Sequence, residues 1–147
     1  MSTLKVDNIT GRGSTGFTGS VKSEGGNTTT DLQQGLVKSW LNFNGTGTIA
    51  ARDSFNHSSL TDVSAGNYTV TMASAMGNVN YSFSGNAAEN NASSASRVIN
   101  FGSNFDSGTL DPNFTTTAFS VNGFYCNSDG QEFDITFITT QIFGDLA

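Results

Sequence analysis

The chain has 147 residues, of which 35% are hydrophobic and only 12% are charged, which suffices for one domain with a hydrophobic core and an additional arm. Six basic and 12 acidic residues give a net charge of −6, and the absence of a basic run argues against nucleic-acid binding. No apolar run approaches a membrane span, so we expect no membrane insertion. Lysine and glutamate are scarce, whereas Thr and Phe are abundant. This composition favours β-structure over helix.

Residues 1–35 are expected to form an extended attachment or intertwining arm. Leu4, Val6 and Ile9 are the only aliphatic cluster among the first 20 residues, and Leu4 and Val6 alternate with polar residues as in a short strand. Such a strand cannot bury one face in isolation. We therefore expect it to pair with another copy of the chain or with a neighbouring protein. The polar, glycine-rich residues that follow are typical of an extended linker.

Residues 36–147 are expected to form an all-β domain. Trp40, Leu41 and Phe43 lie in a first strand that ends at the Asn44-Gly45 turn. Further strands are predicted over residues 48–55, 60–64, 68–72 and 79–84. In the fourth of these five strands, Tyr68, Val70 and Met72 alternate with Thr and are expected to face the core.

The second half of the domain is predicted to contain longer loops. Residues 85–96 and 102–117 are polar and are expected to be loops, on either side of a strand or edge segment at 97–101. The remaining predicted elements are strand pieces at 118–121 and 124–127, a turn at 128–131 and a long strand at 132–143. Seven or eight short strands at about ten-residue spacing are typical of an antiparallel β-sandwich.

Residues that could support catalysis or bind a metal do not form a recognisable set. One histidine, His57, and one cysteine, Cys126, cannot make a structural zinc site. We expect His57 to lie exposed in a turn and Cys126 to be a small apolar residue. Arg52 and Asp53 are expected to make a cross-strand ion pair or backbone hydrogen bonds that fix a bend. We expect no catalytic residues, no cofactor and no metal.

Two parts of the sequence resemble a known family. Residues 38–56, followed by residues 59–62 and 66–70, resemble the C-terminal domain of tail-fibre proteins of marine bacteriophages such as cyanophages, and residues 2–7 resemble the start of the same proteins. Together these segments cover about half of the chain. The layout of the remainder is similar to trimeric tail-fibre tip domains and, more distantly, to H-type lectins. The resemblance implies a β-sandwich homotrimer on a virion tail, synthesised in the host cytoplasm.

The expected function is that of a structural component of a phage tail that contributes to attachment to the host surface. The expected partner on the host is a surface glycan or an envelope protein. In this interpretation the arm binds other tail proteins and the domain is displayed outward. Binding residues are expected on loops above the scaffold, namely Tyr125, Asn127, Asp129, Gln131, Asn90 and Asn91. Two alternatives stay open: an architectural decoration or joining protein without a receptor, and a polysaccharide depolymerase.

Overall fold

A computed structural model of the chain describes residues 20–22, 29–31, 35–89, 97–101, 114–125 and 132–147. The chain divides into two units, Met1–Leu36 and Val37–Ala147. In the first unit, β1 (Ser20–Lys22) pairs antiparallel with β2 (Thr29–Asp31). Leu4, Val6 and Ile9 lie outside the described residues, so their role in attachment stays a prediction.

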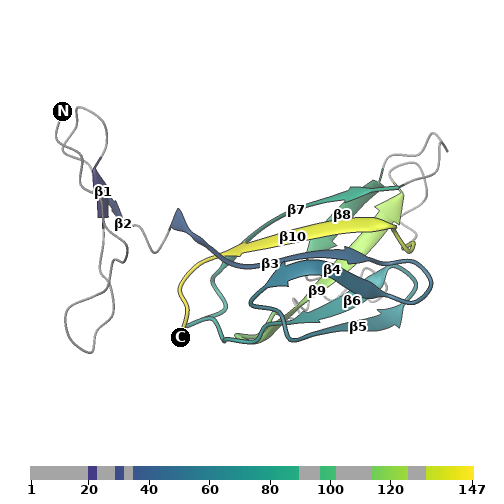
Figure 1. Cartoon of the computed structure of the whole chain (residues 1–147), viewed down its shortest axis with the longest axis horizontal. Helices are drawn as coiled ribbons and strands as arrows, with labels where there is room; N and C mark the ends of the chain where they lie inside the picture. The colour runs from purple at the N-terminus through teal and green to yellow at the C-terminus, as the bar shows by residue number, and fades with distance from the viewer. Residues whose placement is uncertain (1–19, 23–28, 32–34, 90–96, 102–113, 126–131) are drawn as a thin grey trace. The chain divides into compact units, whose positions relative to one another are not determined.

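The second unit consists of two four-stranded antiparallel sheets that pack together as a β-sandwich, which confirms the predicted fold class (Figure 1). One sheet has the strand order β4-β3-β10-β7 and the other β5-β6-β9-β8. The strands are β3 (Val37–Asn44), β4 (Ala50–Phe55), β5 (Ser59–Ser64), β6 (Asn67–Thr71), β7 (Ser82–Ala88), β8 (Arg97–Phe101), β9 (Ala118–Tyr125) and β10 (Phe137–Phe143). In the described part of the chain, no helix is long and apolar enough to cross a membrane.

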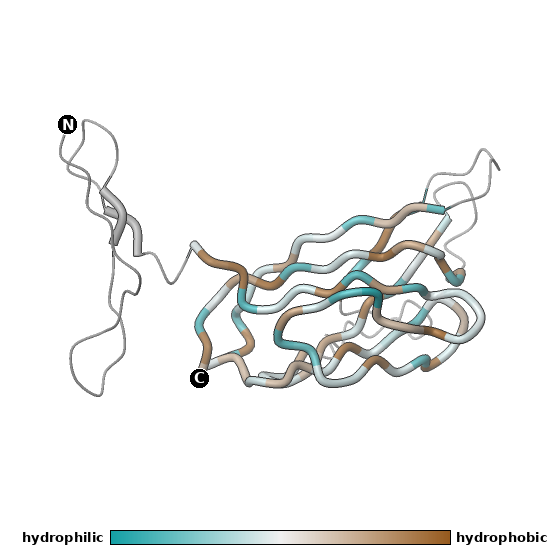
Figure 2. Tube along the Cα trace, viewed as in Figure 1, coloured by the Kyte–Doolittle hydropathy of each residue, from teal (hydrophilic) through white to brown (hydrophobic). Residues whose placement is uncertain are grey.

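Alternating side chains from the central strands fill the space between the two sheets. Buried and more exposed positions alternate along β10 and from Trp40 to the end of β3, as expected for strands that bury one face. Figure 2 shows hydrophobic and hydrophilic residues mixed along the strands of both sheets. Tyr68, Val70 and Met72 are buried, as the sequence predicts. The other buried hydrophobic residues of this core are Leu41, Phe43, Met76, Tyr81, Phe119, Val121, Ile135, Ile138 and Ile142.

Phenylalanine rings join the two sheets near β7 and β8. The ring of Phe83 stacks on that of Phe101, with centroids 4.8 Å apart, and meets the ring of Phe119 edge-on at 5.5 Å. Phe114 also packs on Phe83, at 4.5 Å. Such ring pairs add about 0.5–1.5 kcal/mol each beyond the area that they bury. The phenylalanine-rich composition thus supplies an inter-sheet cluster.

A buried polar cluster closes one end of the sandwich. The Tyr68 hydroxyl lies 2.7 Å from the carbonyl oxygen of Gly45 and 3.0 Å from Oδ1 of Asp134, and can donate its proton to either. The same Oδ1 accepts a 2.7 Å bond from the backbone N–H of Gly66, a turn residue with φ of +70°. Burial, reinforced by the Asp134 carboxylate, raises the pKa of Tyr68 well above its usual value. The cluster fixes the β3–β4 loop and the β5–β6 turn to the segment before β10.

Asn56 fixes the corner at which the chain passes from β4 in one sheet to β5 in the other. Its backbone is left-handed, with φ of +54°, a conformation that Asn tolerates better than most residues. The amide Nδ2 donates to the carbonyl oxygens of Lys38 and Ser74 at 3.0 and 3.2 Å. Oδ1 accepts a 2.6 Å bond from the Ser74 N–H. One side chain therefore joins three segments of backbone.

Several predicted elements differ from the observed ones in their bounds. The strand predicted over residues 79–84 begins at Ser82 and continues to Ala88, so the predicted loop from residue 85 is wrong at its start. A Cβ on Gly85 would lie 2.7 Å from Cδ1 of Ile99, so glycine permits the close approach of β8. The predicted pieces at 118–121 and 124–127 join into one strand through Tyr125. The long strand predicted from residue 132 begins only at Phe137.

Candidate functional site

Of the predicted host-contact residues, only Tyr125 lies in the described part of the chain. Asn90, Asn91, Asn127, Asp129 and Gln131 lie outside it, as does Cys126. The structure therefore gives no geometry for most of the predicted loop site, which stays a prediction.

Tyr125 sits in a stack at the end of the sheet formed by β5, β6, β9 and β8. It is paired with Arg97 across β8 and β9, and the Arg97 guanidinium carbon lies 3.7 Å from the centroid of its ring. The ring of Phe133 lies 3.8 Å from the Tyr125 centroid at an interplanar angle of 31°. A cation on an aromatic face contributes about 0.5–2 kcal/mol. The ring of Tyr125 is thus already in contact with two side chains of the same chain.

A second group of aromatic residues lies on the solvent-facing side of the other sheet. Strand alternation turns Leu41, Ile138 and Ile142 to the core and the residues between them to solvent. Trp40 stands opposite Phe55 on β4 and Gln141 on β10 in the strand register. We call this surface the outer face; it consists of Trp40, Asn42, Asp53, Phe55, Ser84, Asn86, Phe137, Thr139, Gln141 and Phe143.

The outer face combines aromatic rings with uncharged hydrogen-bonding groups. The side chain of Phe55 is 52% exposed, and Trp40 and Phe137 are partly buried. Asn42 stands opposite Thr139 in the register. Amides and hydroxyls both donate and accept hydrogen bonds. The centre of the outer face can therefore contact a neutral polar ligand through both ring surfaces and hydrogen bonds.

A β-bulge on β4 places Arg52 at one end of the outer face. The register between β3 and β4 shifts at this point, so Arg52 is the extra residue that leaves the ladder. Its two terminal nitrogens donate to the carbonyl oxygens of Phe43 at 2.5 Å and Thr136 at 2.7 Å, and its guanidinium carbon lies 4.2 Å from the Phe137 ring centroid. Of the two expectations for Arg52, backbone hydrogen bonds that fix a bend are confirmed.

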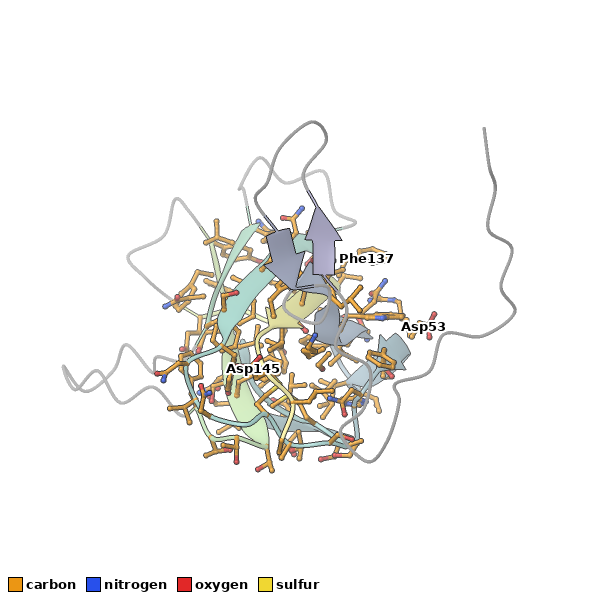
Figure 3. All side chains as sticks on the ribbon, turned by 90° about the vertical axis from the view of Figure 1, so that its left-hand side faces the viewer. Asp53, Phe137 and Asp145 are labelled. Atoms are coloured by element: carbon orange, nitrogen blue, oxygen red, sulfur yellow. The ribbon has the colours of Figure 1, made fainter. Side chains whose placement is uncertain are left out.

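Asp53 follows the bulge and also belongs to this side of the sheet. It stands opposite Asn42 in the register, and its Oδ1 accepts a 2.8 Å bond from the N–H of Ser54. Figure 3 shows Asp53 and Phe137 toward one side of the ribbon, with Asp145 well away from them. Charge on the outer face is thus carried at its β4 edge by Arg52 and Asp53.

Other carboxylates in the described residues accept hydrogen bonds that support the fold. Glu89 accepts bonds from both the hydroxyl and the N–H of Thr136. Glu132 accepts a 2.7 Å bond from Nδ2 of the buried Asn122. No group of three or more His, Cys, Asp or Glu side chains in the described residues could hold a metal ion. His57 is partly buried with its Nε2 enclosed, so the expectation of an exposed turn histidine is wrong.

The sequence contains a signal for the outer face that the loop-centred prediction did not use. Trp40 and Asn42 alternate with Leu41 and Phe43, so a strand that buries Leu41 and Phe43 must turn Trp40 outward. Only the strand register shows that Phe55 and Gln141 stand beside Trp40. The residues that make up the outer face could therefore be identified only from the structure.

No protein-family model matches the sequence. The searches found no similar curated protein and no similar solved structure.

Proposed function

We propose that the chain is a structural component of a bacteriophage tail, a fibre or fibre-like appendage whose β-sandwich contributes to attachment to the host surface. The observation that carries this proposal is the outer face: a surface of aromatic, amide and hydroxyl side chains, with Arg52 and Asp53 at its β4 edge. Its central residues, Trp40 and Asn42, belong to the segment that resembles marine phage tail fibres. A function in attachment needs such a surface and a mounting segment, for which residues 1–35 are available.

Hydrogen bonds between segments far apart in the chain hold the sandwich together, and this supports a binding role for its surface. Arg52 ties β4 to the segment before β10, and Tyr68 and Asp134 tie the β3–β4 loop to the β5–β6 turn. Asn56 fixes the corner between the sheets. A preorganised surface loses less conformational entropy when it binds.

In this proposal the chain works as a homotrimer in the virion tail, with the arm bound to other tail proteins. Several copies on one particle would convert weak single contacts into firm attachment through avidity. Sedimentation equilibrium of the full chain and of a chain lacking residues 1–35 tests the assembly. Trimers are expected for the full chain, and a monomer for both would contradict the trimeric arrangement.

Attachment is tested by incubating the fluorescently labelled full chain with a panel of marine cyanobacteria and other marine bacteria. Flow cytometry is expected to show saturable binding to a subset of strains, which excess unlabelled protein abolishes. Equal binding to all strains, or none that unlabelled protein displaces, would refute host attachment. Incorporation into particles without any such binding would instead identify a purely architectural protein.

A further inference from the structure

We propose that the outer face is a binding site for a neutral polysaccharide, lying along the strands β3 and β10. This inference rests on the proposed attachment function and assigns the site and ligand class within it. Of the predicted contact residues, the described one, Tyr125, lies instead on β9 in the other sheet. The two locations can be separated by experiment because Trp40 lies on the outer face.

Two aromatic rings of the outer face lie next to each other. Phe55 is 52% exposed and stands opposite the partly buried Trp40 on the neighbouring strand. Aromatic rings contact the apolar C–H faces of pyranose rings, and a buried ring face contributes through the area that it removes from water. Phe55 and Trp40 therefore supply a platform on which a sugar ring can rest.

The aromatic positions of the outer face are spaced along the strands. Ile138 pairs with Phe43, so Phe137 is level with the residue four positions after Trp40. Four residues of extended strand span about 13 Å. Between these aromatic positions lie Asn42 and Thr139, directly opposite each other. The Trp40–Phe55 pair at one end, the Phe137 ring under the Arg52 guanidinium at the other, and hydroxyl and amide groups between them suit an extended chain of several sugars better than a single sugar.

The charge of the outer face favours a neutral ligand. Asn42, Thr139 and Gln141 are uncharged, the carboxylate-bearing Asp53 stands opposite Asn42, and the whole chain carries −6. An acidic polysaccharide would lose hydration there and meet the like charge of Asp53. The guanidinium of Arg52 is already directed to two backbone carbonyls and the Phe137 ring. A neutral glycan, which needs only hydrogen bonds and ring contact, fits the available groups.

A direct test uses the fluorescence of Trp40, because the chain contains one tryptophan. The full-length protein is titrated with cellohexaose, laminarihexaose, maltohexaose, mannohexaose and, as an acidic comparison, hexagalacturonate. At least one neutral hexasaccharide is expected to change the emission with saturation, and hexagalacturonate is expected to bind more weakly. No saturable change with any of the neutral probes at millimolar concentration would overturn the proposal, as would preferential binding of hexagalacturonate.

Two exposed residues on opposite sheets provide a matched pair of variants. Phe55→Ser is expected to raise the dissociation constant about five- to tenfold, from the loss of half a ring's contact. Val63→Ser changes a residue on β5 that is 57% exposed and should leave the constant unchanged. Equal effects of both variants, with both folded by circular dichroism, would overturn the assignment of the site.

Two further outcomes separate this proposal from the function on which it rests. If Phe55→Ser binds host cells as well as the unchanged protein does, the attachment function stands and the outer face is not its site. If acrylamide cannot quench Trp40 in the native oligomer, a second copy covers the face and the glycan site is refuted. Loss of cell binding in Phe55→Ser but not in Val63→Ser supports both proposals together.

Discussion

Removing the hydroxyl of Tyr68 should destabilise the sandwich more than removing the hydroxyl of the other well-buried tyrosine, Tyr81. Tyr68 is 0% exposed and Tyr81 is 7% exposed, so Tyr→Phe deletes one buried hydroxyl in each case. The Tyr81 hydroxyl donates to the carbonyl oxygen of Thr115 at 2.7 Å, a bond between neutral groups. The Tyr68 hydroxyl also faces the Asp134 carboxylate at 3.0 Å.

The magnitudes follow from the type of hydrogen bond. A neutral hydrogen bond contributes about 0.5–1.5 kcal/mol, and one to a charged group about 1.5–3 kcal/mol. Tyr68→Phe also leaves the carbonyl oxygen of the buried Gly45 without its 2.7 Å donor. We expect a loss of about 2–3 kcal/mol in the free energy of unfolding for Tyr68→Phe and about 1 kcal/mol for Tyr81→Phe.

Urea denaturation followed by circular dichroism measures both losses. A double-mutant cycle with Asp134→Asn isolates the coupling between the hydroxyl and the carboxylate, which we expect to be about 1 kcal/mol. The reasoning is refuted if Tyr68→Phe costs no more than Tyr81→Phe, or if the coupling is under about 0.3 kcal/mol, the usual limit of additivity.

Three other perturbations give separate tests of the structure. Gly66→Ala should cost more than Gly47→Ala by denaturation, because both have positive φ but only the former would bring a Cβ within 2.8 Å of backbone; equal losses would contradict this packing. Asn56→Asp keeps the acceptor for Ser74 but removes both Nδ2 bonds, so we expect a loss of about 1–3 kcal/mol, and an unchanged midpoint would contradict it. Burial raises the pKa of Tyr81 to about 12, so its stabilisation is complete below pH about 10 and is lost as pH rises toward 12. From pH 10 to 11 the unchanged protein should lose about 1 kcal/mol more than Tyr81→Phe, and equal losses would refute this.

Strand alternation allowed the sequence to predict the parts of the fold that depend on local pattern. The placement of Tyr68, Val70 and Met72 in the core follows from a period of two, and the structure confirms it. The start of β10 was not predictable in this way, because residues 132–136 continue the same alternation. In the structure Phe133 donates to the carbonyl oxygen of Gly123, and this distant contact holds the segment outside the strand.

The contacts that shape the candidate site join residues far apart in the chain. Arg52 and Thr136 are 84 residues apart, and Tyr68 and Asp134 are 66 apart. A single sequence gives no register between such segments, so it cannot show that Phe55 and Gln141 both neighbour Trp40. For Arg52 the sequence left open a cross-strand ion pair and backbone hydrogen bonds that fix a bend, and the contacts to Phe43 and Thr136 show the second.

Immunogold electron microscopy with an antibody raised against residues 37–147 tests whether the chain belongs to a phage tail, as we propose. The sample is purified particles from a phage lysate that contains the protein, with the unpurified lysate as a control for antibody recognition. We expect gold label on the tail or its fibres and none on the capsid. Strong recognition of the protein in the lysate, with no label on purified particles or with label confined to the capsid, would contradict the assignment to the tail.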